Sequence, residues 1–291
     1  MTVQIENDFL IATIAEEGAE LISLKSKKHQ IEYLWQGDPK FWGRHAPVLF
    51  PIVGRLKNDQ YTFENQTFSM SQHGFARDSL FEVIEHAPEL ASFSLKSDKE
   101  TKQKYPFDFE LILSYELEED QLIVKYQVEN TGNKEMYFSI GGHPAFNVPL
   151  EQHLTFDDYF LGFSPQKSRI QIPLSGPYAD FEHKTLGQTN TSLDLRRELF
   201  KNDAVIFETK GVNTFTIETD ESPHSISLSY TDMPYVGIWS PYDKEAPFVC
   251  IEPWCGIADE VNTSGKLVDK KGINRLAAAD IFKTQYTLTA K

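Results

Sequence analysis

Two short stretches of this 291-residue chain join an ionisable side chain to a following proline. His143 stands in Gly-Gly-His-Pro at 141–144, and Glu252 stands in Ile-Glu-Pro at 251–253. Proline disfavours helical backbone at the residue before it, so we expect both side chains on extended chain at strand ends. A carboxylate that continues an apolar strand face is costly to bury unless it is paired or faces a wet cleft. We therefore interpret the two strand ends as facing one pocket.

An imidazole and a carboxylate across a small pocket could act as acid and base. The carboxylate of Glu252 can take a hydroxyl proton, and the imidazole of His143, with an ordinary pKa of about 6.5, can give one near neutral pH. Opening a sugar ring needs such a pair, because the anomeric hydroxyl loses a proton while the ring oxygen gains one. Two structural alternatives stay open: a core histidine bonded to backbone, and a strand-end carboxylate in a salt bridge or in solvent.

Three further polar side chains could hold the hydroxyl groups of such a substrate. Arg55 follows an apolar run with two prolines, 47–54, which cannot be a regular helix or a central strand. His73 and Arg77 lie in one turn-like stretch, where the histidine could equally stabilise the turn. Aromatic residues, 13% of the chain, could supply stacking faces, although core packing explains any one of them. The aromatic candidates are Trp35, Trp42, Phe75, Trp239 and Trp254.

Other chemistries find less support in the sequence. It contains no Gly-rich phosphate loop, Gly-x-Ser-x-Gly elbow or His-Glu-x-x-His motif. A metal site built from His73, His143 and Glu252 is an alternative that spacing neither supports nor excludes, and we expect neither a metal nor a cofactor. Cys250 and Cys255 lack the second pair that a zinc site would need, so we expect both to be reduced and at least partly buried.

The net charge of −15 argues against nucleic acid and against an anionic membrane surface as partners. No apolar run approaches the roughly 18 residues of a membrane span. The N-terminus lacks the basic start and apolar core of a signal peptide. These features predict a cytoplasmic protein whose partner is a small molecule; they leave its oligomeric state open.

Most of the chain has the pattern of short strands separated by polar turns. Apolar and polar residues alternate over 122–129, which is typical of a strand with one buried face. A hairpin is predicted over 60–70, and short helices at 193–200 and 275–280. Strand otherwise follows strand, so the sequence predicts one large antiparallel β-sandwich or barrel, a single domain over 1–291.

Three motifs, in this order, resemble the aldose 1-epimerase (galactose mutarotase) family, in particular its bacterial lactose-operon-associated branch. They are Gln-His-Gly-Phe-Ala-Arg at 72–77, Gly-Gly-His-Pro-Ala-Phe-Asn at 141–147 and Ile-Glu-Pro-Trp at 251–254. The resemblance implies an all-β fold, a galactose mutarotase-like antiparallel sandwich. It also implies interconversion of the α and β anomers of a hexose without a cofactor.

The resemblance also implies roles for individual residues. His143 would be the general acid and Glu252 the general base. His73 and Arg55 would bind substrate, and Asp203 resembles the family's hydroxyl-binding aspartate. The glycines before His143 would let a sugar ring approach the strand end closely.

The motif that contains Arg77 is also similar to one in the hexose-6-phosphate 1-epimerase branch, where its arginine helps to hold phosphate. Segment 44–77 carries four basic residues against two acidic ones, in a strongly acidic chain. The second phosphate-binding arginine has no clean match, because Arg44 is displaced from the expected position. A hexose 6-phosphate substrate and a non-catalytic sugar-binding protein therefore stay open as alternatives.

Overall fold

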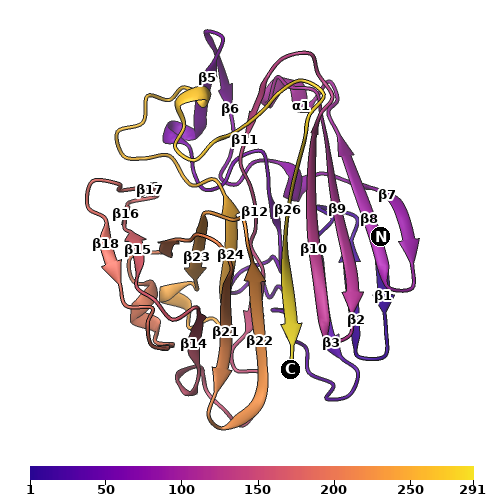
Figure 1. Cartoon of the computed structure of the whole chain (residues 1–291), viewed down its shortest axis with the longest axis vertical. Helices are drawn as coiled ribbons and strands as arrows, with labels where there is room; N and C mark the ends of the chain where they lie inside the picture. Colours follow the sequence, from indigo (N-terminus) through magenta and orange to yellow (C-terminus); the bar gives the residue numbers. More distant parts are fainter.

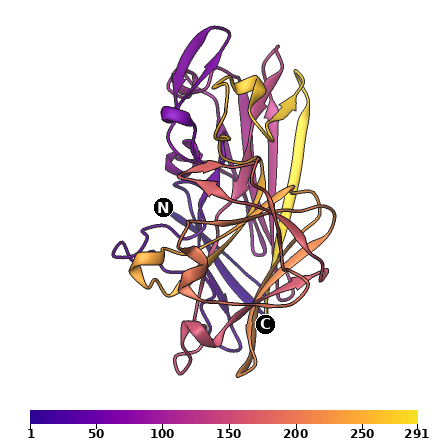
Figure 2. The same ribbon diagram turned by 90° about the vertical axis from the view of Figure 1, so that its left-hand side faces the viewer.

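Two large antiparallel β-sheets dominate the computed structural model, which describes all residues 1–291. Figure 1 shows the longest strands side by side along the long axis of the molecule, and Figure 2 shows the molecule from the side. The nine-stranded sheet has the spatial order β19 (Leu193–Asp194), β14 (Phe160–Ser164), β21 (Asn213–Thr219), β22 (Ser222–Tyr230), β26 (Ile281–Ala290), β10 (Gln121–Asn130), β9 (Phe109–Glu118), β8 (Leu90–Lys96) and β7 (Glu82–Ala87).

The eight-stranded sheet carries the residues of chemical interest. Its order is β18 (Thr185–Gly187), β15 (Arg169–Ile172), β20 (Val205–Glu208), β23 (Tyr235–Trp239), β24 (Phe248–Cys255), β12 (Ile140–Gly142) and β4 (Val48–Leu49), and β13 (Ala145–Asn147) pairs with β24 beyond β12. A three-stranded sheet and three two-stranded sheets complete the fold. Their strands are β1 (Thr2–Glu6), β2 (Leu10–Ala15) and β3 (Leu21–Ser26); β5 (Gln60–Phe63) and β6 (Gln66–Ser69); β11 (Met136–Phe138) and β25 (Asn274–Leu276); β16 (Leu174–Ser175) and β17 (Tyr178–Ala179).

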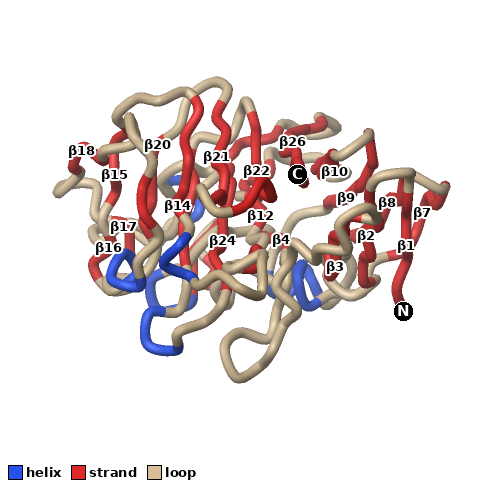
Figure 3. The backbone as a smooth tube through the Cα atoms, turned by 90° about the horizontal axis from the view of Figure 1, so that it is seen from below, coloured by secondary structure: helices blue, strands red, loops and turns tan.

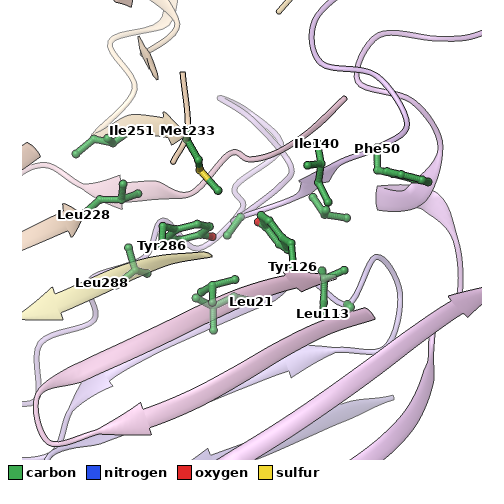
Figure 4. Close-up of a cluster of buried hydrophobic side chains, with 14 of the residues drawn as sticks. Leu21, Phe50, Leu113, Tyr126, Ile140, Leu228, Met233, Ile251, Tyr286 and Leu288 are labelled. Carbon is green, nitrogen blue, oxygen red and sulfur yellow. The ribbon is translucent and has the colours of Figure 1, made fainter. Parts of the chain in front are cut away.

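The core fills the space between the sheets. Along β10 the residues alternate between buried and half-buried, as the sequence pattern predicted, so one face of the strand points inward. Figure 4 shows Tyr126 and Tyr286 of the nine-stranded sheet reaching toward Ile140 and Ile251 of the other sheet. One cluster of 63 buried residues runs through both sheets. The all-β sandwich expected from the sequence is confirmed.

Helices are confined to single turns outside the sheets, as Figure 3 shows in blue. The only α-helical turn is α1 (Thr101–Lys104), and the 3₁₀ turns are η1 (Lys57–Asp59), η2 (Ala76–Asp78), η3 (Phe156–Asp158), η4 (Arg197–Phe200), η5 (Tyr242–Lys244) and η6 (Leu267–Asp269). None of these helices has the length and apolar character needed to cross a membrane.

Both helices predicted from the sequence are corrected by strand pairing. Residues 193–200 divide into β19, which pairs with β14, and the turn η4, so only the second half is helical. Residues 275–280 begin in β25, which pairs with β11, and Ala279 has a φ of 62°, outside the helical region. In both places pairing with a distant strand outweighs local helix propensity.

Candidate active site

Strand register sets His143 directly opposite Glu252. β12 and β13 both pair with β24, and the peptide at His143-Pro144 separates them. The pairs on the two sides of this break are Ile140 with Cys255 and Ala145 with Cys250. The register is the same on both sides, so the residue that faces His143 is Glu252, from a part of the chain more than a hundred residues away. The expectation that the two motifs face one pocket agrees with this geometry.

The sequence suggested that Glu252 ends its strand, but the structure places it inside β24. β24 continues through Pro253 to Cys255, and every residue in it is buried. The N–H of Ile251 donates to the carbonyl of Pro144, and the backbone nitrogen two residues later faces the same side. The nitrogen of Pro253 therefore points at the break between β12 and β13, where the sheet needs no donor.

The two side chains form a close, buried pair. Nε2 of His143 lies 3.2 Å from Oε2 of Glu252, and the side chains are 8% and 3% exposed. Burial lowers the pKa of His143 to about 3 and raises the pKa of Glu252 well above its ordinary value, with the carboxylate of Asp203 adding to the rise. Because burial disfavours both charged forms, the pair holds one proton between its two side chains near neutral pH.

Aromatic rings enclose the imidazole of His143. The ring of Trp42 stacks on it with centroids 4.8 Å apart and planes 27° apart, and Trp239 meets it edge-on at 5.7 Å. Nδ1 of His143 has no hydrogen-bond partner. Trp42, Trp239 and Trp254 line the cleft, whereas Trp35 and Phe75 pack into the core. Only three of the five aromatic candidates are therefore placed to contact a substrate.

His73 both stabilises its turn and lines the cleft. It has a φ of 67°, and Gly74 follows with a φ of 75°; a Cβ at Gly74 would lie 2.2 Å from the carbonyl oxygen of Phe50. The N–H of Gly54 donates to Nδ1 of His73 over 3.1 Å, and Nε2 of His73 lies 3.3 Å from the amide nitrogen of Gln72. Burial lowers the pKa of His73 well below its ordinary value, and His143 and nearby arginines add to the effect. The imidazole is therefore neutral beside His143.

The basic side chains are held by short contacts at the rim of the cleft. Arg55 donates to Asp59 and to Oε1 of Gln72, each over 3.1 Å. Arg77 donates to the carbonyl of Gln72 over 2.7 Å, while its buried Nε makes no hydrogen bond and lies 3.9 Å from Oδ2 of Asp78. Arg44, which has no motif of its own, is paired with an aspartate at 2.7 Å and lines the same cleft.

These side chains surround a cleft of about 650 Å³. All six residues singled out from the sequence line it: His143, Glu252, Arg55, His73, Arg77 and Asp203. Sequence reasoning missed Phe41, Tyr242 and Lys244 as lining residues, because no motif marks them. Their loops reach the cleft only through the tertiary fold.

The glycines before His143 do not open a path for a sugar. Both are buried, and an added Cβ at Gly141 would lie 2.7 Å from the ring of Trp254, while one at Gly142 would lie 2.9 Å from the hydroxyl of Tyr126. They allow close packing beneath the cleft, so the role suggested from the sequence is wrong.

One donor set near the pair could hold a metal ion. Ligand atoms of His143, Cys250 and Glu252 lie within 4.8 Å of one another, whereas the sequence-based alternative named His73 in place of the cysteine. Cys250 and Cys255 are free and buried, as expected. This set of donors is chemically suited to zinc.

Fold and site together define an antiparallel β-sandwich protein with an imidazole–carboxylate pair inside a cleft of small-molecule size. Residues 1–271 match the sequence model of the family described as aldose 1-epimerase, and the chain belongs to this family, which makes it a carbohydrate epimerase by class.

Relatives cover the chain almost completely. Protein LacX of Lactococcus lactis is 33% identical over 299 aligned positions, which span 99% of each chain. The structure of a galactose mutarotase related enzyme from Lactobacillus acidophilus is 41% identical, with a TM-score of 0.99 over 100% of this chain and 97% of that one. A galactose mutarotase-like protein from Lactobacillus casei is 37% identical, with a TM-score of 0.93 over all of both chains. The resemblance to the lactose-operon-associated branch is thereby confirmed.

Proposed function

We propose that the protein is an aldose 1-epimerase that interconverts the α and β anomers of a hexose, with His143 as acid and Glu252 as base. The observation that carries the proposal is the 3.2 Å separation of Nε2 and Oε2 in a buried site that opens to the cleft. The anomeric oxygen and the ring oxygen are bonded to the same carbon, so an acid and a base that lie side by side can each be within hydrogen-bond reach of one of them.

The reaction begins from the state in which His143 carries the shared proton and Glu252 is ionised. Glu252 takes the proton of the anomeric hydroxyl, His143 gives its proton to the ring oxygen, and the bond between that oxygen and the anomeric carbon breaks. Rotation about the adjacent carbon–carbon bond turns the other face of the aldehyde toward the ring hydroxyl. The reverse transfers close the ring as the other anomer and leave the enzyme unchanged.

The remaining lining residues would hold the sugar in place. The neutral imidazole of His73, the guanidinium of Arg55 and the exposed carboxylate of Asp203 present donors and acceptors to hydroxyl groups. Desolvation inside the aromatic enclosure would strengthen these contacts.

Exchange spectroscopy by NMR on glucose or galactose tests the proposal. We expect catalysed interconversion by the wild-type protein and its loss in Glu252→Gln, with the circular dichroism spectrum unchanged. A wild-type rate no faster than buffer, for every sugar tried, would overturn the proposal.

A hexose 6-phosphate is the second candidate substrate, and the arginines favour it. Arg44, Arg55 and Arg77 all line the cleft. A phosphate would accept hydrogen bonds from their guanidinium groups. We expect Arg77→Ala to weaken turnover of the phosphosugar selectively, with the exposed Arg275→Ala as control. Equal losses on free and phosphorylated sugar would count against this substrate.

The third alternative, a non-catalytic sugar-binding protein on the same scaffold, makes a different prediction. Calorimetry would then detect sugar binding while exchange spectroscopy detects no interconversion. The presence of both members of the acid–base pair favours the enzyme.

A further inference from the structure

A buried ion pair lies behind one wall of the cleft. Nζ of Lys270 is 3.0 Å from Oδ1 of Asp259, and the side chains are 2% and 4% exposed. The same ammonium donates to the carbonyl of Ile257 over 2.7 Å. Burying two charges costs several kcal/mol per ion, and apolar residues of similar volume often serve stability as well or better. Fold stability alone therefore accounts poorly for this pair.

Asp259 makes two hydrogen bonds to the backbone that directly follows the Arg55 side chain. Its N–H donates to the carbonyl of Arg55 over 3.0 Å, and its Oδ2 accepts from the N–H of Lys57 over 2.9 Å. On the other flank, Gly54 packs so closely on Ala258 that an added Cβ would lie 2.5 Å from the alanine Cβ. Segment 54–57, which presents the Arg55 guanidinium to the cleft, is thus fixed against the loop that carries Asp259.

The same segment holds His73. The N–H of Gly54 donates to Nδ1 of His73, and the N–H of His73 donates back to the carbonyl of Gly54 over 2.9 Å. The carbonyl of Asp259 also accepts from Ala179, in the hairpin whose Pro177 lines the cleft. Through its side chain and its backbone, Asp259 therefore contacts two walls of the cleft, segment 54–57 and the hairpin of β16 and β17, and His73 is bonded to the first of them.

We propose that Asp259 and Lys270 are positioning residues for substrate binding. Lys270 fixes the carboxylate through Oδ1, which leaves Oδ2 aimed at Lys57. The backbone of residues 54–57 then sets the guanidinium of Arg55 and the imidazole of His73 at the geometry that holds the sugar. Neither residue of the pair touches the substrate. The inference rests on the proposed function, because it assigns the pair to that site.

A double-mutant cycle tests the inference. Lys270→Met removes the charge at similar side-chain length and releases the carboxylate, so we expect KM for the preferred sugar to rise by about tenfold while kcat changes by less than about threefold. The pH profile of kcat, which reports on His143 and Glu252, should not move. In the Arg55→Ala background the same change should raise KM by clearly less, because part of its effect passes through Arg55.

One control and one replacement variant accompany the cycle. Lys125→Met breaks a surface pair with Glu116, far from the cleft, and should leave KM unchanged. If Lys270→Met fails to fold, the double variant Asp259→Asn/Lys270→Met removes both buried charges and enters the cycle in its place. The positioning role would be overturned if Lys270→Met raised KM by the same factor in the wild-type and the Arg55→Ala backgrounds. It would also be overturned if Lys270→Met lowered kcat and the thermal midpoint but left KM unchanged.

The outcomes separate this inference from the proposed function. If the wild-type protein is active but the KM effects of Lys270→Met and Arg55→Ala are independent, only the positioning role is refuted. Wild-type protein that binds sugar without exchanging anomers defeats the enzyme proposal, and the cycle is then measured as dissociation constants by calorimetry. Protein that neither binds nor converts any sugar defeats both.

Discussion

Burial raises the pKa of the Glu252 carboxyl well above its ordinary 4.5, and the nearby carboxylate of Asp203 adds to the rise. Above pH 4.5 the unfolded chain has released this proton while the folded chain still holds it. The stability that the protonated, buried carboxyl contributes is therefore complete below pH 4.5 and is lost as pH rises toward the folded pKa. Wild-type stability is thus reduced near neutral pH by a residue that the proposed reaction needs.

Glu252→Gln should therefore stabilise the fold while it removes activity. The gain should grow with pH by up to about 1.4 kcal/mol for each pH unit between the unfolded and folded pKa values. Thermal midpoints of wild type and variant, measured from about pH 5 to pH 8, check this. The exposed Glu82→Gln provides the matched control and should follow wild type across the range. A stability difference that stays flat or narrows with pH would contradict the argument.

At the scale of the strand, β12 can lie this close to β24 because Gly141 has no side chain. A Cβ on Gly141 would lie 2.8 Å from the carbonyl oxygen of Pro253, which is backbone and cannot move aside cheaply. Gly141→Ala should therefore lower stability by about 1–3 kcal/mol and reduce activity by displacing His143. Chemical denaturation measures the first effect. Gly43→Ala, whose Cβ would meet only ordinary contacts at 3.8 Å, should be nearly neutral; equal losses in both variants would refute the packing argument.

Local pattern was a good guide to single strands and a poor one to their partners. The alternation in β10 and the hairpin of β5 and β6 are encoded locally and could be predicted. The strand register that places Glu252 opposite His143 depends on pairing between segments more than a hundred residues apart, which no local pattern encodes. It was inferred from chemistry and family resemblance instead.

The predicted site residues show the same division. Each of them lines the cleft, and their roles stay predictions. Arg44 was noted only as a displaced match to a phosphate-binding arginine, and nothing in the sequence marked Asp259 or Lys270. The role proposed for Asp259 and Lys270 depends on hydrogen bonds to the backbone of Lys57 and Ile257, which only the folded chain brings close to them.

The core of the whole molecule is continuous from one end of the chain to the other. One cluster of buried side chains runs from Val3 to Ala290, and β26, the last strand, pairs with both β22 and β10 inside the nine-stranded sheet. Besides two smaller clusters of 7 and 5 buried residues, the sheet that carries His143 and Glu252 shares this large cluster with the nine-stranded sheet. This supports the prediction that residues 1–291 form one domain.

Cooperative unfolding follows from this continuity, and the tryptophans offer a local probe of it. All four lie at or behind the cleft wall formed by β23 and β24, so their fluorescence reports on the site, whereas far-UV circular dichroism reports on both sheets. We expect a single urea transition with the same midpoint and slope by both probes. An earlier fluorescence transition would mean that the cleft wall unfolds by itself, and the single-domain prediction would then fail. Coincident transitions would also mean that core mutations far from the cleft reduce activity chiefly by depleting the folded population, because the pair at His143 and Glu252 cannot persist in a partly unfolded chain.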